Sequence, residues 1–210
     1  MAEQDDNGRV AAMDFYRLHA NDYAEATRDV DMRPFYAHFL GHVPEGGHVL
    51  DAGCGSGRDA LAFSRMGLKV AAFDASPDMA ALASQHAGIE VEVLSFSESV
   101  DAVKKLHGPF DGIWACASLL HVPEAEQRLA WAWLWSLLKT GGVIYASYKL
   151  GTGERTDALG RTFTDGDEER VQTWSGGLPG IKVLETWLSQ DQRNDSRETW
   201  FNVLVRQQHN

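Results

Sequence analysis

The chain alternates between two spacings of apolar residues. Short apolar runs of the length expected for buried strands fall at residues 48–50, 68–73, 89–94, 112–115 and 143–148. Segments with helical spacing lie between them, at residues 58–66, 79–88 and 124–138. Near the end, two alternating segments, 181–191 and 198–207, flank the turn 192–197 and predict a β-hairpin. This order predicts one α/β domain with a seven-stranded sheet, parallel except for its last strand, and helices on both faces.

The segment before the first strand is expected to be helical. Residues 1–8 are polar and acidic and predict a disordered tail, so that the single domain spans residues 9–210. Loosely helical spacing predicts a first helix that ends near His19 and is followed by a polar segment. A second helix is predicted over residues 34–43, with three apolar side chains facing inward: Phe35, Phe39 and Leu40.

The helix predicted over residues 124–138 is rich in tryptophan. Trp131 and Trp135 lie four apart on one side, which is more typical of core packing than of a stacking surface. Glycines at 141 and 142 are expected to close the helix with a left-handed cap. Four side chains are expected to face the sheet: Leu129, Trp131, Leu134 and Leu138.

Residues 48–60, HVLDAGCGSGRDA, place three glycines on alternate positions between a strand and a helix. Gly53, Gly55 and Gly57 can adopt positive φ and carry no Cβ, so a ligand can approach the backbone and the first N–H groups of the helix. A dinucleotide fingerprint needs its third glycine where this chain has Arg58, and no Gly-Lys-Ser/Thr follows as a P-loop requires. The stretch therefore predicts a ligand cradle of another kind.

A second carboxylate ends the next predicted strand. Asp74 follows Asp51 by 23 residues, which is the separation that one strand-helix-strand unit needs. A ribose diol requires an acceptor-only partner, and a carboxylate at this position supplies one. The spacing DxGxGxG with this second acid resembles the class I S-adenosylmethionine-dependent methyltransferases, which implies a Rossmann-like fold and S-adenosylmethionine as cofactor, with S-adenosylhomocysteine as product.

The resemblance also implies the remaining cofactor contacts. The lead-in over residues 9–44 is similar to a segment that folds over the cofactor as a helical lid, in which residues matching Tyr16, Tyr23 and Arg28 approach its methionine end. Aromatic faces attract a sulfonium and a guanidinium pairs with a carboxylate, although each tyrosine is as readily a core residue. The remaining positions implied by their place in the motifs are Cys54, Ala75, Ser76, Met79, Phe96, Ser97, Ala115 and Cys116.

Two of these positions have strong alternatives. Met79 is more often a core residue than a ligand contact. Phe96 stands where the family commonly has an acid that bonds the adenine amino group, so Phe96 is expected either to stack on the ring or to pack in the core, and a backbone N–H near Ser97 is expected to reach the adenine.

The stretch 109–123 resembles the family's fourth motif and contributes the histidine best placed for catalysis. An imidazole at His121 can take a proton from a hydroxyl, thiol or amine, but a structural role is the more frequent one at this position. The Asn/Asp-Pro-Pro-Tyr/Phe motif of enzymes that methylate nucleobase amines or peptide amides is absent. No pair of histidines has metal-ligand spacing, so no metal is predicted.

Residues 149–180 interrupt the strand-helix rhythm with a polar, glycine-rich crossover and a short helix near 165–174. A solvated connection is one reading. The resemblance places this segment over the active-site edge, where Lys149, Arg155 and Arg161 would form a cationic spot that suits an anionic substrate.

The composition of the chain limits the classes of molecule that the protein is expected to bind. A net charge of −11 in 210 residues argues against nucleic acid and anionic membranes, and favours a small-molecule substrate. No apolar run approaches a membrane span, no targeting signal is visible, and the two cysteines are expected to be reduced, which indicates a cytoplasmic protein. The predicted function is methyl transfer to an O, N or S nucleophile. The alternatives are a non-catalytic protein that binds the same cofactor and a nicotinamide-dependent oxidoreductase.

Overall fold

A computed structural model describes residues 18–96, 104–158, 161–193 and 196–208. The predicted tail at residues 1–8, Tyr16 and Ser97 lie outside these ranges. The strands are β1 (His48–Ala52), β2 (Lys69–Asp74), β3 (Val91–Val93), β4 (Phe110–Ala115), β5 (Leu138–Lys149), β6 (Glu154–Thr156), β7 (Thr162–Thr164), β8 (Ile181–Gln190) and β9 (Thr199–Gln207). The helices are the one formed by residues 18–28, α2 (Arg33–Leu40), α3 (Arg58–Arg65), α4 (Pro77–Ala87), α6 (Gln127–Ser136) and α7 (Glu168–Ser175).

Seven strands form one sheet in the order β3-β2-β1-β4-β5-β9-β8. The pairings from β3 to β5 are parallel, while β9 is antiparallel to both β5 and β8. The predicted seven-stranded sheet with an antiparallel last strand is therefore confirmed. Since β9 lies between β5 and β8, the antiparallel strand is inside the sheet, and β8 forms its edge.

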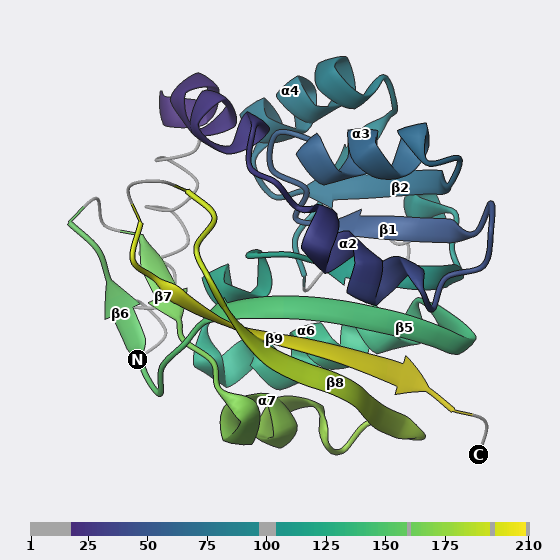
Figure 1. Cartoon of the computed structure of the whole chain (residues 1–210), viewed down its shortest axis with the longest axis vertical. Coiled ribbons are helices and arrows are strands. Elements are labelled where there is room, and N and C mark those ends of the chain that lie inside the picture. The colour runs from purple at the N-terminus through teal and green to yellow at the C-terminus, as the bar shows by residue number, and fades with distance from the viewer. Residues whose placement is uncertain (1–17, 97–103, 159–160, 194–195, 209–210) are drawn as a thin grey trace.

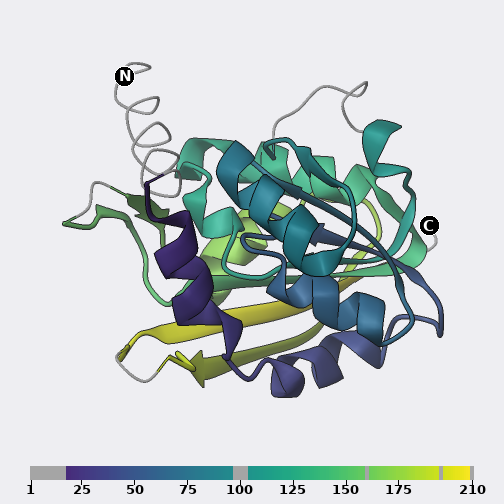
Figure 2. The same ribbon diagram turned by 90° about the horizontal axis from the view of Figure 1, so that it is seen from above.

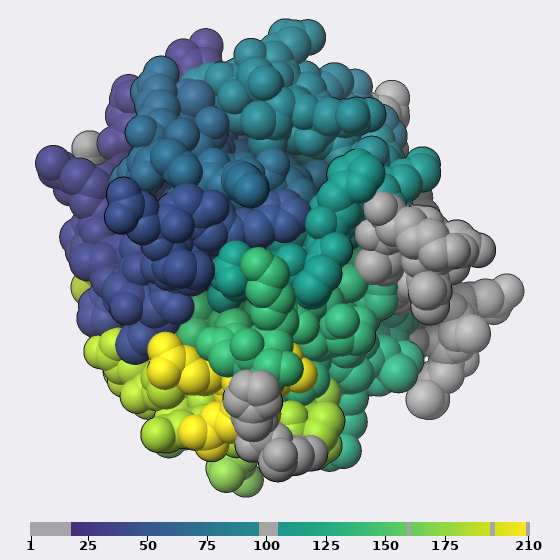
Figure 3. Space-filling view, turned by 90° about the vertical axis from the view of Figure 1, so that its right-hand side faces the viewer, coloured from purple at the N-terminus to yellow at the C-terminus, as the bar shows by residue number. Residues whose placement is uncertain are grey.

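Alternate residues of the central strands pack on opposite faces of the sheet. Leu50 and Ile113 contact the layer that contains Trp131 of α6. Their neighbours Val49 and Trp114 contact the layer that contains α2 and α3. Helices therefore cover both faces (Figure 1), as a largely parallel sheet requires. Figure 3 shows the end of the molecule at which the parallel strands begin, opposite their carboxyl ends. Segments from almost every part of the chain meet at this end.

The carboxyl ends of the parallel strands meet three connecting segments. The helix of residues 18–28, the β6–β7 hairpin and the β8–β9 turn lie at this same end in two perpendicular views (Figures 1 and 2). In open α/β sheets, ligands bind outside these strand ends. Segments that are far apart in the sequence therefore surround the region where a ligand is expected.

Three element predictions near the middle of the chain were wrong. Helix α6 ends at Ser136 and is capped by Leu137, so the glycines do not cap it. The chain from Leu138 onward is already part of strand β5 and pairs with β4. The pairing shifts register between Phe110 and Gly112, and Gly141 lies inside β5 at this irregularity. Leu129 is 66% exposed and does not face the sheet. Short-range spacing cannot tell a helix end from a strand that starts with a bulge.

The N-terminal and crossover segments also differ from the predictions. Residues 20–28, expected as a polar segment, are helical, because Ala20, Ala24 and Thr27 form a buried stripe at helical spacing. The crossover contains the β6–β7 hairpin in addition to α7. The predicted core tryptophans are confirmed, since Trp131 and Trp135 are both buried.

Candidate functional site

A cavity of about 320 Å³ opens at the carboxyl ends of the parallel strands. Its inner end is lined by the helix of residues 18–28, the β1–α3 and β2–α4 turns, and the segments that follow β3 and β4. It is also lined by residues from β5, β9 and the β8–β9 turn, and its outer end is the part around Phe163 of β7, where Lys149 and Arg161 approach the ring. The predicted cradle and the crossover thus share one cavity.

The glycine cradle is a tight turn with three residues of positive φ. Gly53, Gly55 and Gly57 have φ values of 72°, 56° and 79°, which L side chains rarely adopt. The backbone N–H groups of Gly53 and Cys54 both donate to the Phe73 carbonyl, at 2.9 Å each. A Cβ on Gly57 would lie 2.9 Å from the Ala83 backbone, so this glycine serves the packing of α3 on α4 and does not line the cavity.

Replacing Gly53 with alanine is expected to weaken S-adenosylhomocysteine binding about tenfold or more, or about 1.4 kcal/mol. The new Cβ would lie 2.6 Å from Cβ of Ser118, so the cradle or the turn after β4 must shift. Gly46→Ala is the matched control, because Gly46 also has positive φ but has no atom within 4 Å of an added Cβ. The positive φ should cost both variants about 1–2 kcal/mol of unfolding free energy, and Gly53→Ala should lose more because of the contact with Ser118. Calorimetric titration should show that only Gly53→Ala loses affinity, and equal losses would contradict the prediction.

Asp74 connects the two turns at the inner end of the cavity. Its Oδ2 accepts a hydrogen bond from the Gly55 backbone N–H at 2.8 Å, and its Oδ1 accepts one from the Ser76 N–H at 2.9 Å. Burial raises the pKa of Asp74 to about 6, against the opposing effect of these two hydrogen bonds. Asp74 is therefore ionised at neutral pH and still faces the cavity.

Asp51 is a buried carboxyl group at the end of β1. It is 2% exposed and lines the cavity, and its Oδ2 has no hydrogen-bond partner among the described residues. Burial, together with the negative charge of Asp59, raises the pKa of Asp51 well above its usual range. A cation in the cavity would supply the missing partner and favour the ionised form.

Asp59, which the sequence reading did not single out, is the hydrogen-bonding centre beneath the cradle. Its carboxylate accepts from Tyr36 Oη at 2.6 Å and Trp114 Nε1 at 2.8 Å, and pairs with Arg58 at 2.7 Å. Burial would raise the pKa of Asp59, but the charge and hydrogen bonds of Arg58, with those of the two aromatic donors, outweigh burial and lower it. Arg58 also donates to the Thr27 carbonyl at 3.4 Å, which links the N-terminal helix to the cradle.

Most of the predicted site residues line the cavity. Arg28 does not: Tyr23 and Thr27, four residues apart, face the cavity, so that Arg28 is rotated away, is exposed, and borders a separate hollow of about 50 Å³. Ala115 is fully buried and does not line the cavity. The predicted residues that do line it are Tyr23, Asp51, Gly53, Cys54, Gly55, Asp74, Ala75, Ser76, Met79, Phe96, Cys116 and His121.

Phe96 packs in the core as one of its two predicted roles, and its stacking on adenine stays a prediction. Its ring packs edge-on against Phe73 at 5.3 Å between centroids, and it also lines the cavity. The two cavity cysteines, Cys54 and Cys116, have pKa values raised by burial, that of Cys116 to about 12. Both thiols are therefore protonated at neutral pH and are poor nucleophiles.

His121 ends a short 3-10 helix, Leu119–His121, at the cavity wall. Its ring lies 5.1 Å from that of Phe163 on β7. Burial, and then the positive charge of Arg161, lowers the pKa of His121 to about 4. The imidazole is therefore neutral at pH 7, which leaves a nitrogen lone pair for a proton, although one of low basicity.

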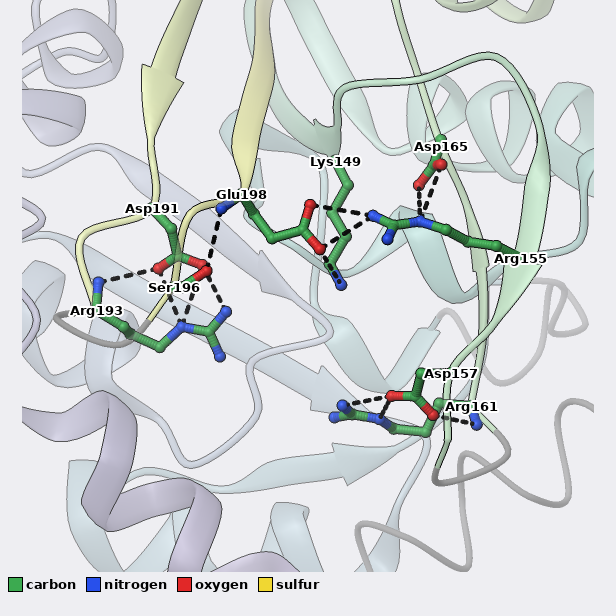
Figure 4. A network of polar contacts seen from close by, with 9 residues as sticks. All are labelled: Lys149, Arg155, Asp157, Arg161, Asp165, Asp191, Arg193, Ser196 and Glu198. Carbon is green, nitrogen blue, oxygen red and sulfur yellow. Dashed lines mark hydrogen bonds and ion pairs between the residues drawn. The ribbon is translucent and has the colours of Figure 1, made fainter.

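The cationic residues predicted in the crossover are all paired with carboxylates. Lys149 lies 3.5 Å from Glu198, which also accepts from Arg155, and Arg161 pairs with Asp157 at 2.7 Å (Figure 4). Lys149 and Arg161 line the cavity, whereas Arg155 does not. No group of three or more metal-ligating side chains occurs within the described ranges, and none of the helices there is long and apolar enough to cross a membrane.

Comparison with known proteins matches one part of the chain to a family model. Residues 49–142, which include the cradle and the turn after β4, match the family model of a methyltransferase domain. This part of the chain is therefore similar to a methyltransferase domain, and the chain has the Rossmann-like fold of solved S-adenosylmethionine-dependent methyltransferases, as its motifs indicated.

The particular relatives differ in what they methylate. A ubiquinone biosynthesis O-methyltransferase of Xanthomonas axonopodis is 34% identical over 108 residues, 50% of this chain and 44% of that protein. The chain thus spans less than half the length of this curated relative. A Burkholderia thailandensis 1,6-didemethyltoxoflavin N1-methyltransferase with bound S-adenosylhomocysteine has a TM-score of 0.76 at 21% identity, covering 95% and 88% of the two chains. A Synechocystis magnesium protoporphyrin IX methyltransferase with bound S-adenosylmethionine has a TM-score of 0.71 at 17% identity, covering 95% and 97%.

Proposed function

We propose that this protein binds S-adenosylmethionine and transfers its methyl group to an O, N or S atom of a small molecule. The observation that carries this proposal is the unpartnered Oδ2 of Asp51, buried beside a glycine cradle in a cavity large enough for a ligand. A buried carboxylate oxygen without a donor is costly, and a cationic ligand offsets that cost. S-adenosylmethionine carries its positive charges at the end that would lie nearest the cradle.

The residues at the inner end fit the other parts of the cofactor. Asp74 has an acceptor-only side chain whose two oxygens each hold one backbone N–H, and each has a further lone pair for a ribose hydroxyl. Phe96 and Met79 offer apolar surface for an adenine ring, and Tyr23 offers an aromatic face for the sulfonium.

When bound, S-adenosylmethionine supplies a methyl group on a positively charged sulfur that is already a good leaving group. The protein's task is then to hold the acceptor in line and to keep water out, which positioning alone can do. His121 is neutral and faces the cavity, so it can take the proton of an acceptor hydroxyl, thiol or amine. The two thiols stay protonated and do not compete for the methyl group.

The test is to incubate the purified protein with methyl-labelled S-adenosylmethionine and a metabolite extract. Transfer of label to a small molecule is expected, and the Gly53→Ala variant should transfer less because its cofactor affinity is lower. Separate calorimetric titrations with S-adenosylmethionine and NAD accompany the assay. Binding of S-adenosylmethionine without transfer would favour a non-catalytic binding protein on this fold. Binding of NAD alone would favour an oxidoreductase and overturn the proposal.

A further inference from the structure

We propose that the outer end of the cavity binds an acceptor that carries a carboxylate, held by Lys149 and Arg161 beside the ring of Phe163. This inference rests on the proposed function, because it names the class of molecule that receives the methyl group. It is independent of the residues that would hold the cofactor, since all three lie in the crossover half of the chain.

The first observation is the distribution of charged side chains along the cavity. Its inner end carries three carboxyl groups and one guanidinium: Asp51, Asp59, Asp74 and Arg58. Its outer end, around Phe163, carries two basic side chains, Lys149 and Arg161, whereas Arg193 of the β8–β9 turn pairs with Asp191 and lies near Tyr23 of the inner end. A cavity with this polarity matches a cationic ligand inside and an anionic ligand outside.

The second observation is the geometry of Lys149 at the end of β5. Its side chain is only 13% exposed, and its ammonium lies 3.9 Å from the centroid of the Phe163 ring. Burial lowers the pKa of Lys149, against the opposing charge of Glu198. An ammonium has three donors, and the ion pair with Glu198, at 3.5 Å, is long for a hydrogen bond. Lys149 therefore has donor capacity left at the cavity wall.

The carboxylates that pair with these cations stand outside the cavity. Neither Glu198 nor Asp157 lines it, so the cavity wall here contains the basic side chains and not their carboxylate partners. Glu198 is held more closely by Arg155, with hydrogen bonds of 3.1 and 3.2 Å (Figure 4). Arg155 also pairs with Asp165 at 3.0 Å, and Lys149 is the more loosely held of the two cations on Glu198.

Phe163 brings the basic groups of the outer end together. Arg161 lies 5.2 Å from its ring centroid on the same hairpin, and His121 contacts the ring from the turn after β4. The ring is almost fully buried and lines the cavity, so it adds an apolar wall beside the two cations and the imidazole. An acceptor with a carboxylate near the two cations and a flat apolar body against this wall would satisfy both features.

The test uses benzoate and benzamide, which match in size and differ in charge, as calorimetric probes of the S-adenosylhomocysteine-saturated protein. Benzoate is expected to bind about tenfold or more tightly than benzamide, the size of a charge-assisted hydrogen bond. Lys149→Met keeps the length of the side chain and removes its charge, so it should reduce this preference, with Arg161 still present, and should not change affinity for benzamide or S-adenosylhomocysteine. Lys182→Met is the matched control, because Lys182 is exposed on β8 and does not line the cavity, and it should change nothing.

Equal binding of the two probes, or binding of neither, would overturn the carboxylate site. So would a Lys149→Met variant that loses affinity for both probes equally, since that result assigns the side chain a packing role. The titration with S-adenosylhomocysteine is separate, and a protein that prefers benzoate but does not bind S-adenosylhomocysteine would retain the anion site and lose the proposed function.

Discussion

Replacing Asp59 with alanine is expected to lower the free energy of unfolding by about 3–5 kcal/mol. The substitution removes the partner of the Arg58 guanidinium and leaves the buried hydroxyl of Tyr36 and the indole N–H of Trp114 without their acceptor. Each of these donors loses its hydration on folding, and without the carboxylate no hydrogen bond offsets that desolvation cost. Equilibrium unfolding in urea, followed by tryptophan fluorescence, measures the loss.

Two further variants show whether the loss of unfolding free energy comes from the hydrogen bonds of the Asp59 carboxylate. Asp59→Asn keeps the size of the side chain and an acceptor oxygen but loses the charge, so its loss should lie between those of wild type and Asp59→Ala. Glu90→Ala removes an exposed carboxylate of the same domain and should stay within about 0.5 kcal/mol of wild type. A loss below about 1 kcal/mol for Asp59→Ala would show that the buried network contributes little.

The second large effect is expected on cofactor affinity. Asp74→Ala should weaken S-adenosylmethionine binding by about 1.5–3 kcal/mol, the range for a hydrogen bond to a charged group. The carboxylate is the proposed acceptor for the ribose, and it also fixes the Gly55 and Ser76 N–H groups, so both the contact and the shape of the cradle are lost. Asp78→Ala is the control, because Asp78 is an exposed acid four residues further along. Unchanged affinity in Asp74→Ala would rule out the ribose assignment.

The pH profile distinguishes the charge of Asp74 from its shape. The ionised carboxylate accepts hydrogen bonds, so affinity should be full above its pKa and fall as the pH drops through about 6. Bound ligand favours the ionised form and shifts this fall to lower pH in the complex. Asp74→Asn keeps the side-chain shape without a charge, and its affinity should not fall with this midpoint.

The features that the sequence predicted are those encoded within a few residues. The cradle and Asp74 each depend on short spacing in the sequence. The order of strands and helices follows from the same local periodicity.

The features that the sequence did not predict depend on contacts across the fold. Asp59 receives its hydrogen bonds from Tyr36 and Trp114, which are 23 and 55 residues away, so nothing near it in the chain marks its role. Arg28 and Thr27 are neighbours in sequence, and only the phase of the helix decides which one faces the cavity. The β6–β7 hairpin consists of two three-residue strands, too short to give a periodic signal.

The match to the methyltransferase domain ends before the residues proposed to hold the acceptor. This bears on how the substrate can change between related proteins. That match stops at residue 142, while Lys149, Arg161 and Phe163 all lie beyond it. Most of the residues that would hold the methyl donor thus precede, in the chain, those proposed to hold the carboxylate of the recipient, while Tyr23 lies before the match and His121 within it. Substitutions beyond residue 142 can therefore change the recipient while the donor site is kept, so relatives that are similar only over this match need not share a substrate.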